Sequence, residues 1–447
     1  MSDLLSIGAS GVRAYQTALD TVGENIANSG TAGYSRRVVG LREVSVGSGA
    51  SAGGYAAGLG VIASGVLRTS DSFAAASLRA AGTDLARTTT TAAWLDRVGK
   101  ALDGNNISAR ITEFFNSSNA LAAEPASNAL RATFLAAAGN VADAVSATGI
   151  AFDQVDADID AQATQTAATL TSLGGSLVRI NDGLGRAPAN TAAAAQLLDQ
   201  RDAILDQMSA ISDLKTTTDS LGRTTVALGP GSGVPFVDIA HSETLLYSRA
   251  GSDVKFEVLT PTGRTPLDPM GGALAGYVEG AQRSSIARAG VEALANDFST
   301  TINEIHMAGE GLDGVGNRKL FTVGGRATDL TVSDSVTSAM VAASSPGSGQ
   351  RNGSNLAQFA TARAANGYES KMTGLITANA AQLKQRNTIA EAQTAIRAGA
   401  ETALSTAIGV NLDSEAIDLM RFQQAYQASS RAIQVARDTL QSILDIR

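Results

Sequence analysis

The residues that could carry out chemistry in this chain are few and widely separated. The only histidines are His241 and His306, and cysteine is absent. The two histidines lack the helical spacing with which paired histidines hold zinc, and no thiolate is present to complete a site. We therefore expect no metal centre and no bound cofactor.

Three carboxylates alternate along the chain as they do at the start of a calcium-binding loop, namely Asp156, Asp158 and Asp160. Such a loop needs a glycine at its sixth position and a bidentate glutamate at its twelfth. Ala161 and Ala167 occupy those positions. We expect the three aspartates to lie on a solvated helix face.

Two glycine-rich runs resemble nucleotide-binding loops in residue type but lack other features that such loops need. GEGLDG, at residues 309–314, follows a helical pattern where a dinucleotide fold needs a strand. GPGSG, at residues 229–233, lacks the lysine of a phosphate-binding loop. The remaining carboxylates are scattered, and no Ser/His/Asp grouping is visible. The sequence therefore favours a protein that is not an enzyme.

Composition narrows the class of partner. Lys+Arg total 34 against 42 Asp+Glu, a net charge of -8, which argues against nucleic acid because phosphate binding needs a basic face. No run approaches the roughly 18 consecutive apolar residues of a membrane span, so we expect no membrane insertion. The N-terminus lacks a basic segment followed by an apolar one, which predicts the absence of a cleaved secretory signal.

The clearest physical signal lies at the two ends, where apolar residues repeat every seven positions. The N-terminal repeat comprises Leu5, Val12, Leu19 and Ile26, with Gly8, Tyr15 and Val22 at the offset positions. The C-terminal repeat comprises Leu412, Leu419, Tyr426, Ile433 and Leu440, with Phe422, Ser429, Ala436 and Ile443. Both ends are predicted to be helices that pair as a coiled coil. They are either core helices of a bundle or helices that become fully ordered only against identical neighbours.

Between the ends, helical periodicity dominates and one segment departs from it. Long helices are predicted over residues 72–102, 107–123, 127–180, 191–211, 272–307 and 355–404. Five of the 8 prolines fall between residues 230 and 269, where β-branched residues alternate with polar ones. That segment predicts a small antiparallel β domain.

The fold class is therefore mainly α with an inserted β domain, organised as discontinuous nested domains. The predicted units are a terminal coiled-coil domain (residues 1–35 with 409–447), a long-helix bundle (36–212 with 271–408) and the β domain (213–270). Residues 320–345 are a candidate for further strands.

The string NIANSGTAGYSRR, at residues 25–37, resembles the N-terminal signature of bacterial flagellar axial proteins, which include rod, hook and hook-associated families. The run GVNLDSEAIDLMRFQQAYQASSRAIQVARDTLQSIL, at residues 409–444, is similar to the matching end of the flagellar hook-associated protein 1 family. The motif residues are Asn25, Asn28, Thr31, Gly33, Tyr34, Asn411, Gln424 and Tyr426.

Interior segments resemble the same family and extend the resemblance over nearly the whole chain. They are residues 107–135, 198–211 and 303–321, the last of which contains His306. The β portion is compact compared with that of larger relatives, and we expect the chain to lack their further surface domain. Nothing attributed to that domain is carried over to this chain.

The resemblance implies a structural subunit of the ring that joins the flagellar hook to the filament adaptor, located outside the cell and exported by the flagellar type III apparatus. The implied partners are identical subunits in a homo-oligomeric ring, the hook protein, the second hook-filament junction protein and an export chaperone on the C-terminal helix. The expected assembly interface comprises Leu5, Val12, Tyr15, Leu19, Val22 and Ile26, facing Leu419, Phe422, Tyr426, Ile433, Leu440 and Ile443.

Three other functions stay open at this point. A sibling axial protein, such as the second junction protein or the hook subunit, would share the terminal motifs. A secreted peptidoglycan-cutting enzyme would need a cleft with paired carboxylates, for which the sequence gives no sign. A cytosolic helical scaffold would keep its terminal helices ordered as a monomer.

Overall fold

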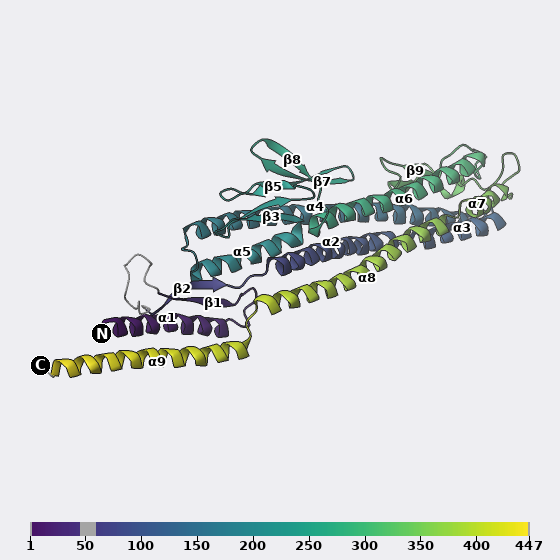
Figure 1. The fold of residues 1–447 in the computed structure, drawn as a ribbon. Coiled ribbons are helices and arrows are strands. Elements are labelled where there is room, and N and C mark those ends of the chain that lie inside the picture. Colours follow the sequence, from purple (N-terminus) through teal and green to yellow (C-terminus); the bar gives the residue numbers. More distant parts are fainter. Residues whose placement is uncertain (1, 45–59, 446–447) are drawn as a thin grey trace.

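A computed structural model describes residues 2–44 and 60–445. Residues 1, 45–59 and 446–447, which belong to the predicted terminal and helical domains, lie outside the described part. The molecule is elongated, and both ends of the chain lie at the same extremity (Figure 1). We call the helices α1 (Ser2–Ala27) and α9 (Leu412–Asp445), together with the hairpin β1–β2, the terminal arm. The rest is the body.

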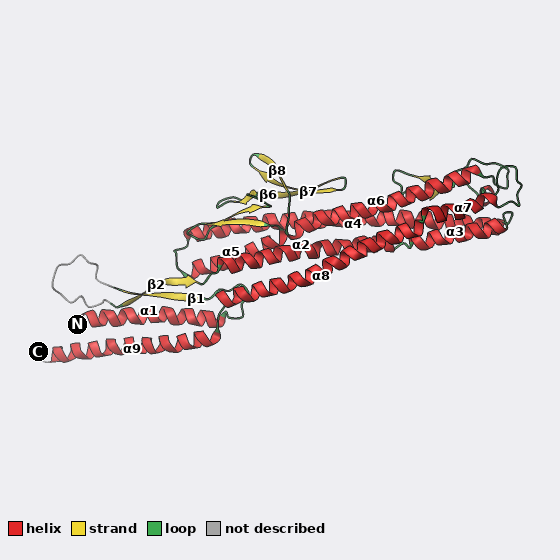
Figure 2. Ribbon diagram, turned by 45° about the vertical axis from the view of Figure 1, so that its right-hand side comes forward, coloured by secondary structure: helices red, strands yellow, loops and turns green. Residues whose placement is uncertain are grey.

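The body is built on long helices that run side by side (Figure 2). They are α2 (Ser72–Asp103), α3 (Ile107–Ala123), α4 (Asn128–Arg186), α5 (Ala192–Ile211), α6 (Gly272–Ala308), α7 (Ser354–Asn366) and α8 (Tyr368–Ile408). These bounds confirm the predicted helices, with one difference. The segment predicted as a single helix over 355–404 is broken at Gly367, whose φ of +56° is left-handed and ends α7.

Polar side chains fix where several helices begin. Asp71 accepts hydrogen bonds from the backbone N–H groups of Phe73 and Ala74 at the start of α2. Ser127 and Thr191 cap α4 and α5 in the same way. Each cap satisfies backbone donors that the first helical turn leaves without a partner, a contribution of about 1 kcal/mol.

Aromatic residues are scarce in the sequence, yet several gather at the end of the body remote from the arm. Phe114 is fully buried, and its ring centroid lies 5.0 Å from that of Phe134 and 5.4 Å from that of Phe298. Tyr368, at the start of α8, contacts Phe298 edge to face at 5.3 Å. This cluster packs α3, α4, α6 and α8 together.

The β insertion is confirmed as two three-stranded antiparallel sheets beside α4 and α6. The sheets comprise β3 (Leu214–Thr218), β4 (Thr224–Leu228) and β5 (Val234–Val237), then β6 (Thr244–Ala250), β7 (Asp253–Thr260) and β8 (Gly263–Leu267). The candidate segment 320–345 holds the short pair β9 (Phe321–Val323) and β10 (Leu330–Val332) and the 3-10 turn η1 (Ser338–Met340).

One β element was not foreseen. Residues 36–68 were assigned to the helical body, but β1 (Arg37–Glu43) and β2 (Val61–Arg68) form an antiparallel hairpin that contacts α1. The pairing contains a bulge next to Gly40, and Gly65 opposite it adopts a φ of +136°. The hairpin therefore belongs to the arm side of the molecule.

Among the described residues, α4 is the one helix long and apolar enough to cross a membrane by length and composition. Half of its most apolar window is buried inside the protein. This burial is typical of the central helix of a bundle, which satisfies the same test.

Candidate functional site

The seam between α1 and α9 is built on glycines. A Cβ atom added to Gly8 would lie 2.6 Å from Cγ1 of Ile433, and one added to Gly11 would lie 2.6 Å from Oγ of Ser429. Only residues without a side chain allow the two backbones to approach this closely. The small residues of the predicted repeat therefore set the spacing of the helix pair.

Aromatic packing continues the seam towards the body. The ring centroids of Tyr15 and Phe422 lie 6.4 Å apart, and the Arg421 guanidinium lies 4.7 Å above the Phe422 ring. The pairing of the terminal helices is thereby confirmed, since Tyr15 meets Phe422 and Gly8 meets Ile433. Val22 is buried.

The other residues expected at the interface remain accessible to different degrees. Half-buried are Leu5, Val12, Leu19, Ile26, Leu419 and Tyr426. Leu440 and Ile443 are 41% and 51% exposed. Because α1 and α9 are antiparallel and Gly8 lies opposite Ile433, these two side chains lie towards the part of α9 that extends to and beyond the start of α1.

A buried polar cluster closes the arm where it meets the body. Asn25 Nδ2 donates to the backbone carbonyl of Arg37 at 2.8 Å and to Glu415 Oε2 at 3.0 Å. Asn25 Oδ1 accepts hydrogen bonds from the Arg37 backbone N–H at 3.0 Å and from the Tyr34 hydroxyl at 2.9 Å. Arg36 Nε donates to Glu415 Oε1 at 2.6 Å. We call these five residues the clasp, because they tie α1, β1 and α9 to one another.

The clasp gives a structural meaning to the motif at residues 25–37. Asn25 and Tyr34 belong to the clasp, and Gly33 turns the chain between them with a φ of +78°. Thr31 donates to Asn28 Oδ1 at 3.3 Å on the exposed surface, which shapes the turn. Burial raises the pKa of the Tyr34 hydroxyl, so this group keeps the proton that it donates.

At the C-terminal motif, the side chain of Asn411 accepts hydrogen bonds from the backbone N–H groups of Asp413 and Ser414 at 3.0 and 3.1 Å. It therefore caps α9. Gln424 is exposed on α9. The sequence analysis did not include Arg36, Arg37 or Glu415 among the site residues, although the two arginines end the motif itself.

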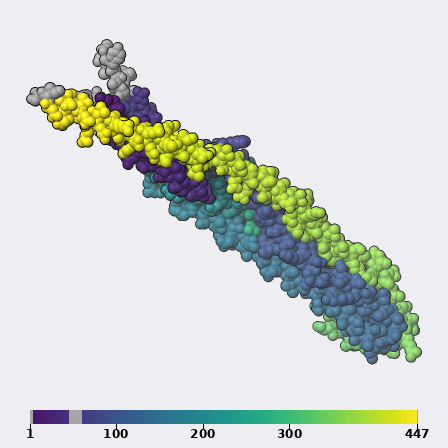
Figure 3. Space-filling model, turned by 90° about the horizontal axis from the view of Figure 1, so that it is seen from below, coloured from purple at the N-terminus to yellow at the C-terminus, as the bar shows by residue number. Residues whose placement is uncertain are grey.

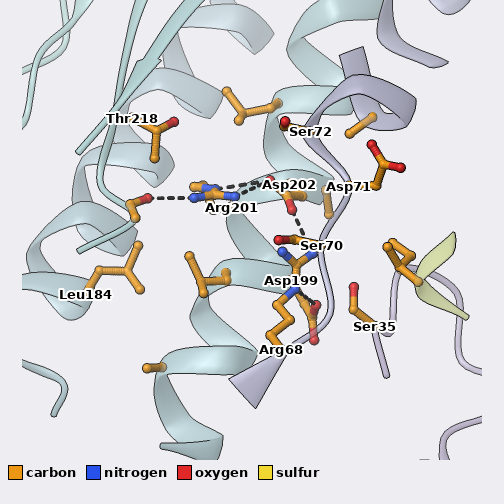
Figure 4. Close-up of a pocket in the computed structure, with 18 of the residues that line it drawn as sticks. Ser35, Arg68, Ser70, Asp71, Ser72, Leu184, Asp199, Arg201, Asp202 and Thr218 are labelled. Carbon is orange, nitrogen blue, oxygen red and sulfur yellow. Dashed lines mark hydrogen bonds and ion pairs between the residues drawn. The ribbon is translucent and has the colours of Figure 1, made fainter. Parts of the chain in front are cut away.

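An ion-pair cluster and a cleft of about 770 Å³ lie beside the clasp (Figure 4). Arg68, at the end of β2, donates to Asp199 and Asp202 of α5, both at 2.7 Å. Burial would raise the pKa of Asp202, but the charges of Arg201 and Arg68 outweigh it and lower that pKa. The cleft is lined by residues between α1 and β1, by the segment from Arg68 to the start of α2, and by α5. The β3–β4 turn and the end of α8 also line it. Nothing in the sequence pattern pointed to this cluster, because its members come from separate elements.

The aspartates that resembled a calcium loop lie on a helix face, as expected, because they belong to α4 and their side chains are 27–38% exposed. Each one also pairs with an arginine, which the sequence did not indicate: Asp156 with Arg288 at 2.8 Å, Asp160 with Arg249 at 2.6 Å, and Asp158 with Arg97. Two of these pairs fasten strand β6 and helix α6 to α4.

The remaining candidates for chemistry serve structural purposes. His306 is fully buried, and its Nδ1 lies 2.7 Å from the backbone carbonyl of Arg318, while its Nε2 accepts a hydrogen bond from the backbone N–H of Ala342. His241 is exposed near Asp238. Across residues 2–44 and 60–445, no three His, Asp or Glu side chains gather as a metal would require.

Comparisons with known proteins agree with this architecture. Residues 94–321 match the family described as the flagellar hook-associated protein FlgK helical domain. Residues 406–446 match the family described as the flagellar basal body rod FlgEFG protein C-terminal. The first match covers the end of α2, helices α3 to α6 and the β insertion, and the second covers α9.

Among curated proteins, flagellar hook-associated protein 1 of Salmonella typhimurium is 29% identical over 208 residues, which is 46% of this chain and 37% of that protein. The protein of the same name from Escherichia coli is 26% identical and is covered to 38%. The matched region thus spans well under half the length of these relatives. A solved structure, of the flagellar hook junction protein FlgK from Burkholderia pseudomallei, has a TM-score of 0.50 at 23% identity and covers 55% of this chain and 46% of its own, which is a likeness of fold.

Proposed function

Because the chain belongs to the FlgK family of flagellar hook-associated proteins, we propose that it is a structural subunit of the junction between the flagellar hook and the filament. In this proposal the chain functions by assembling with other subunits, and the terminal arm makes the contacts.

The observation that carries the proposal is the distribution of exposed apolar side chains. More than half of the exposed large hydrophobic residues in the described part of the chain lie on the arm, which is a small fraction of the molecule. On α9 they are Leu412, Ile417, Met420, Val435, Leu440, Ile443 and Leu444. Figure 3 shows α9 in yellow, lying open along one face of the molecule. Concentrated apolar surface of this kind is typical of protein–protein contacts.

Copies of the chain would pack their arms side by side. The half-buried residues Leu5, Val12 and Leu19 flank the α1–α9 seam, so a neighbouring arm could cover them. Each fully buried aliphatic side chain contributes about 1.5–3 kcal/mol, and a seam of several would hold a ring together. Repeated head-to-tail contacts close into a ring when their rotation is right.

The partners follow from this position. We infer contacts with the hook protein on one side and with the second hook-filament junction protein on the other. The exposed end of α9, around Leu440 and Ile443, is a suitable site for an export chaperone before assembly.

The domains inferred from the sequence are nested (1–35 with 409–447, 36–212 with 271–408, and 213–270). In the assembled ring, this nesting would place the arm at the inner wall. The β domain would then face solvent outside the cell.

A sibling axial protein is the competing interpretation, since the α9 segment matches a family named for rod and hook proteins. The match of residues 94–321 favours the hook-associated family.

Deletion of the gene in its host, followed by complementation, tests the proposal. We expect cells with hooks but no filaments, with filament subunits released into the medium, and restoration by the intact gene. Normal filaments on the deletion strain would refute the junction role, and the absence of hooks would favour a rod or hook function.

A further inference from the structure

The base of the β1–β2 hairpin brings two like charges together. Arg37 and Arg68 are direct cross-strand partners in the hairpin register. Their side chains are only 10% and 7% exposed. Two cations opposite each other on neighbouring strands destabilise a sheet, and burial increases that cost.

One carboxylate from the body lies between them. Asp199, on α5, lies 2.7 Å from Arg68 Nε and 3.6 Å from a terminal nitrogen of Arg37. Its side chain is 14% exposed. Each arginine also has an ion-pair partner of its own. Arg37 pairs with Glu24 of α1 at 3.0 Å, and Arg68 pairs with Asp202 at 2.7 Å. Asp199 is therefore the carboxylate that both strands share.

Besides the ion pair between Arg68 and Asp202, two backbone hydrogen bonds link arm and body at this place. The Val66 N–H donates to the Asn190 carbonyl at 2.7 Å, and the Arg36 N–H donates to the Ile408 carbonyl at 2.8 Å. A cleft of about 770 Å³, which both Arg68 and Asp199 line, lies at this attachment. An attachment of this polar kind permits relative motion unless specific contacts prevent it.

We propose that Asp199 is the positioning residue that fixes the direction in which the terminal arm leaves the body. It neutralises the Arg37–Arg68 pair and joins both strands to α5 in one contact. Without it, Arg37 keeps only Glu24 and Arg68 keeps only Asp202, no negative charge lies between the two guanidinium groups, and the two strands lose the contact with α5 that they share. The biological meaning of a fixed direction rests on the proposed function, because arms in a ring must project alike.

The test uses the full chain and measures the distance between arm and body. The sequence has no cysteine, so spin labels at Gln16→Cys on α1 and Gln165→Cys on α4 report one distance by pulsed electron resonance. Both positions are exposed. We expect a narrow distance distribution with Asp199 intact, at least a doubling of its width in Asp199→Asn, and recovery in Asp199→Glu, which restores the charge. Arg68→Gln, which removes the contact from the other side, should broaden the distribution as well.

Asp206→Asn is the matched control, because Asp206 is another α5 carboxylate that pairs with an arginine, Arg79, within the body. It should keep the narrow distribution. The proposal is overturned if Asp199→Asn stays as narrow as the parent chain, or if Asp206→Asn broadens equally. Circular dichroism confirms that each variant has a folded body. Since the measurement is made on the isolated chain, its failure would leave the junction role untouched.

Discussion

Asn25 and Glu415, which are 390 residues apart in the sequence, are joined by a hydrogen bond of 3.0 Å, and both side chains are fully buried. This contact ties the end of α1 to the beginning of α9. It explains why the motif at residues 25–37 contains more than the glycines that end a helix. The motif also supplies the polar side chains of the clasp.

Replacement of Asn25 by alanine should loosen the arm while leaving the body intact. The change leaves the Arg37 backbone N–H without its acceptor and Glu415 Oε2 without its donor in a buried place, at a cost of about 1–3 kcal/mol, while Arg36 still pairs with Glu415 Oε1. Hydrogen exchange should then accelerate in α1 and α9 only. Ser29→Ala is the control, because the Ser29 hydroxyl bonds only the nearby Ile26 carbonyl on the exposed surface, and α1 and α9 of this variant should exchange as they do in the parent chain.

Gly8→Ala should weaken the pairing of the terminal helices. The new methyl group would lie 2.6 Å from an Ile433 side-chain atom and 3.2 Å from the Ser429 carbonyl oxygen, so the helices must separate, at a cost of about 1–3 kcal/mol. Gly23→Ala, on the same helix with nothing within 4 Å, should instead stabilise α1 by about 0.5–1 kcal/mol. Thermal unfolding monitored at the arm distinguishes the two. Equal effects of both substitutions would contradict the close approach.

Ile433→Asp should abolish incorporation into the flagellum. A carboxylate at this half-buried position cannot pack against Gly8 and would carry charge into the seam. Motility and electron microscopy of a complemented deletion strain measure the outcome, and circular dichroism of the purified variant should report a folded body. Gln434→Asp introduces the same residue on the exposed face and should support normal assembly.

Stability should fall as the pH drops below 6.5, the ordinary pKa of histidine, because of His306. Burial lowers its pKa from the ordinary 6.5, and its Nε2 accepts a backbone hydrogen bond that the protonated ring cannot accept. The unfolded chain therefore binds the proton more readily, so the free energy of unfolding decreases as the pH drops through this range. Urea unfolding at several pH values measures the slope.

His306→Gln should flatten that slope, and it should lower stability at pH 7.5 because the contacts to Arg318 and Ala342 are perturbed. His241→Gln, at an exposed position, is the control and should retain the slope of the parent chain. An unchanged slope in His306→Gln would assign the pH dependence to other groups.

The sequence was informative where structure depends on local pattern. The helix over 107–123 was predicted to the residue, and the β insertion predicted over 213–270 contains six strands between Leu214 and Leu267. These elements follow from periodicity, prolines and caps within each segment.

The parts that were missed depend on distant partners. The hairpin β1–β2 pairs strands that are separated by residues 44–60, and its base is completed by Asp199 on another element. The heptad pattern identified the right helices, but it gave weight to large residues such as Leu19. Gly8 was part of that pattern, but Gly11, which approaches α9 equally closely, was missed, because the fit between two backbones depends on small residues that hydrophobicity does not reveal.

The central claim is that this chain forms the junction through its arm, and its location in the flagellum tests that claim most directly. A short epitope inserted between Pro261 and Thr262, in the exposed β7–β8 turn, can be labelled with gold in intact flagella of a motile, complemented strain. The account predicts label in a single narrow band where the hook meets the filament. Label along the hook, along the filament or only on the cell body would contradict it.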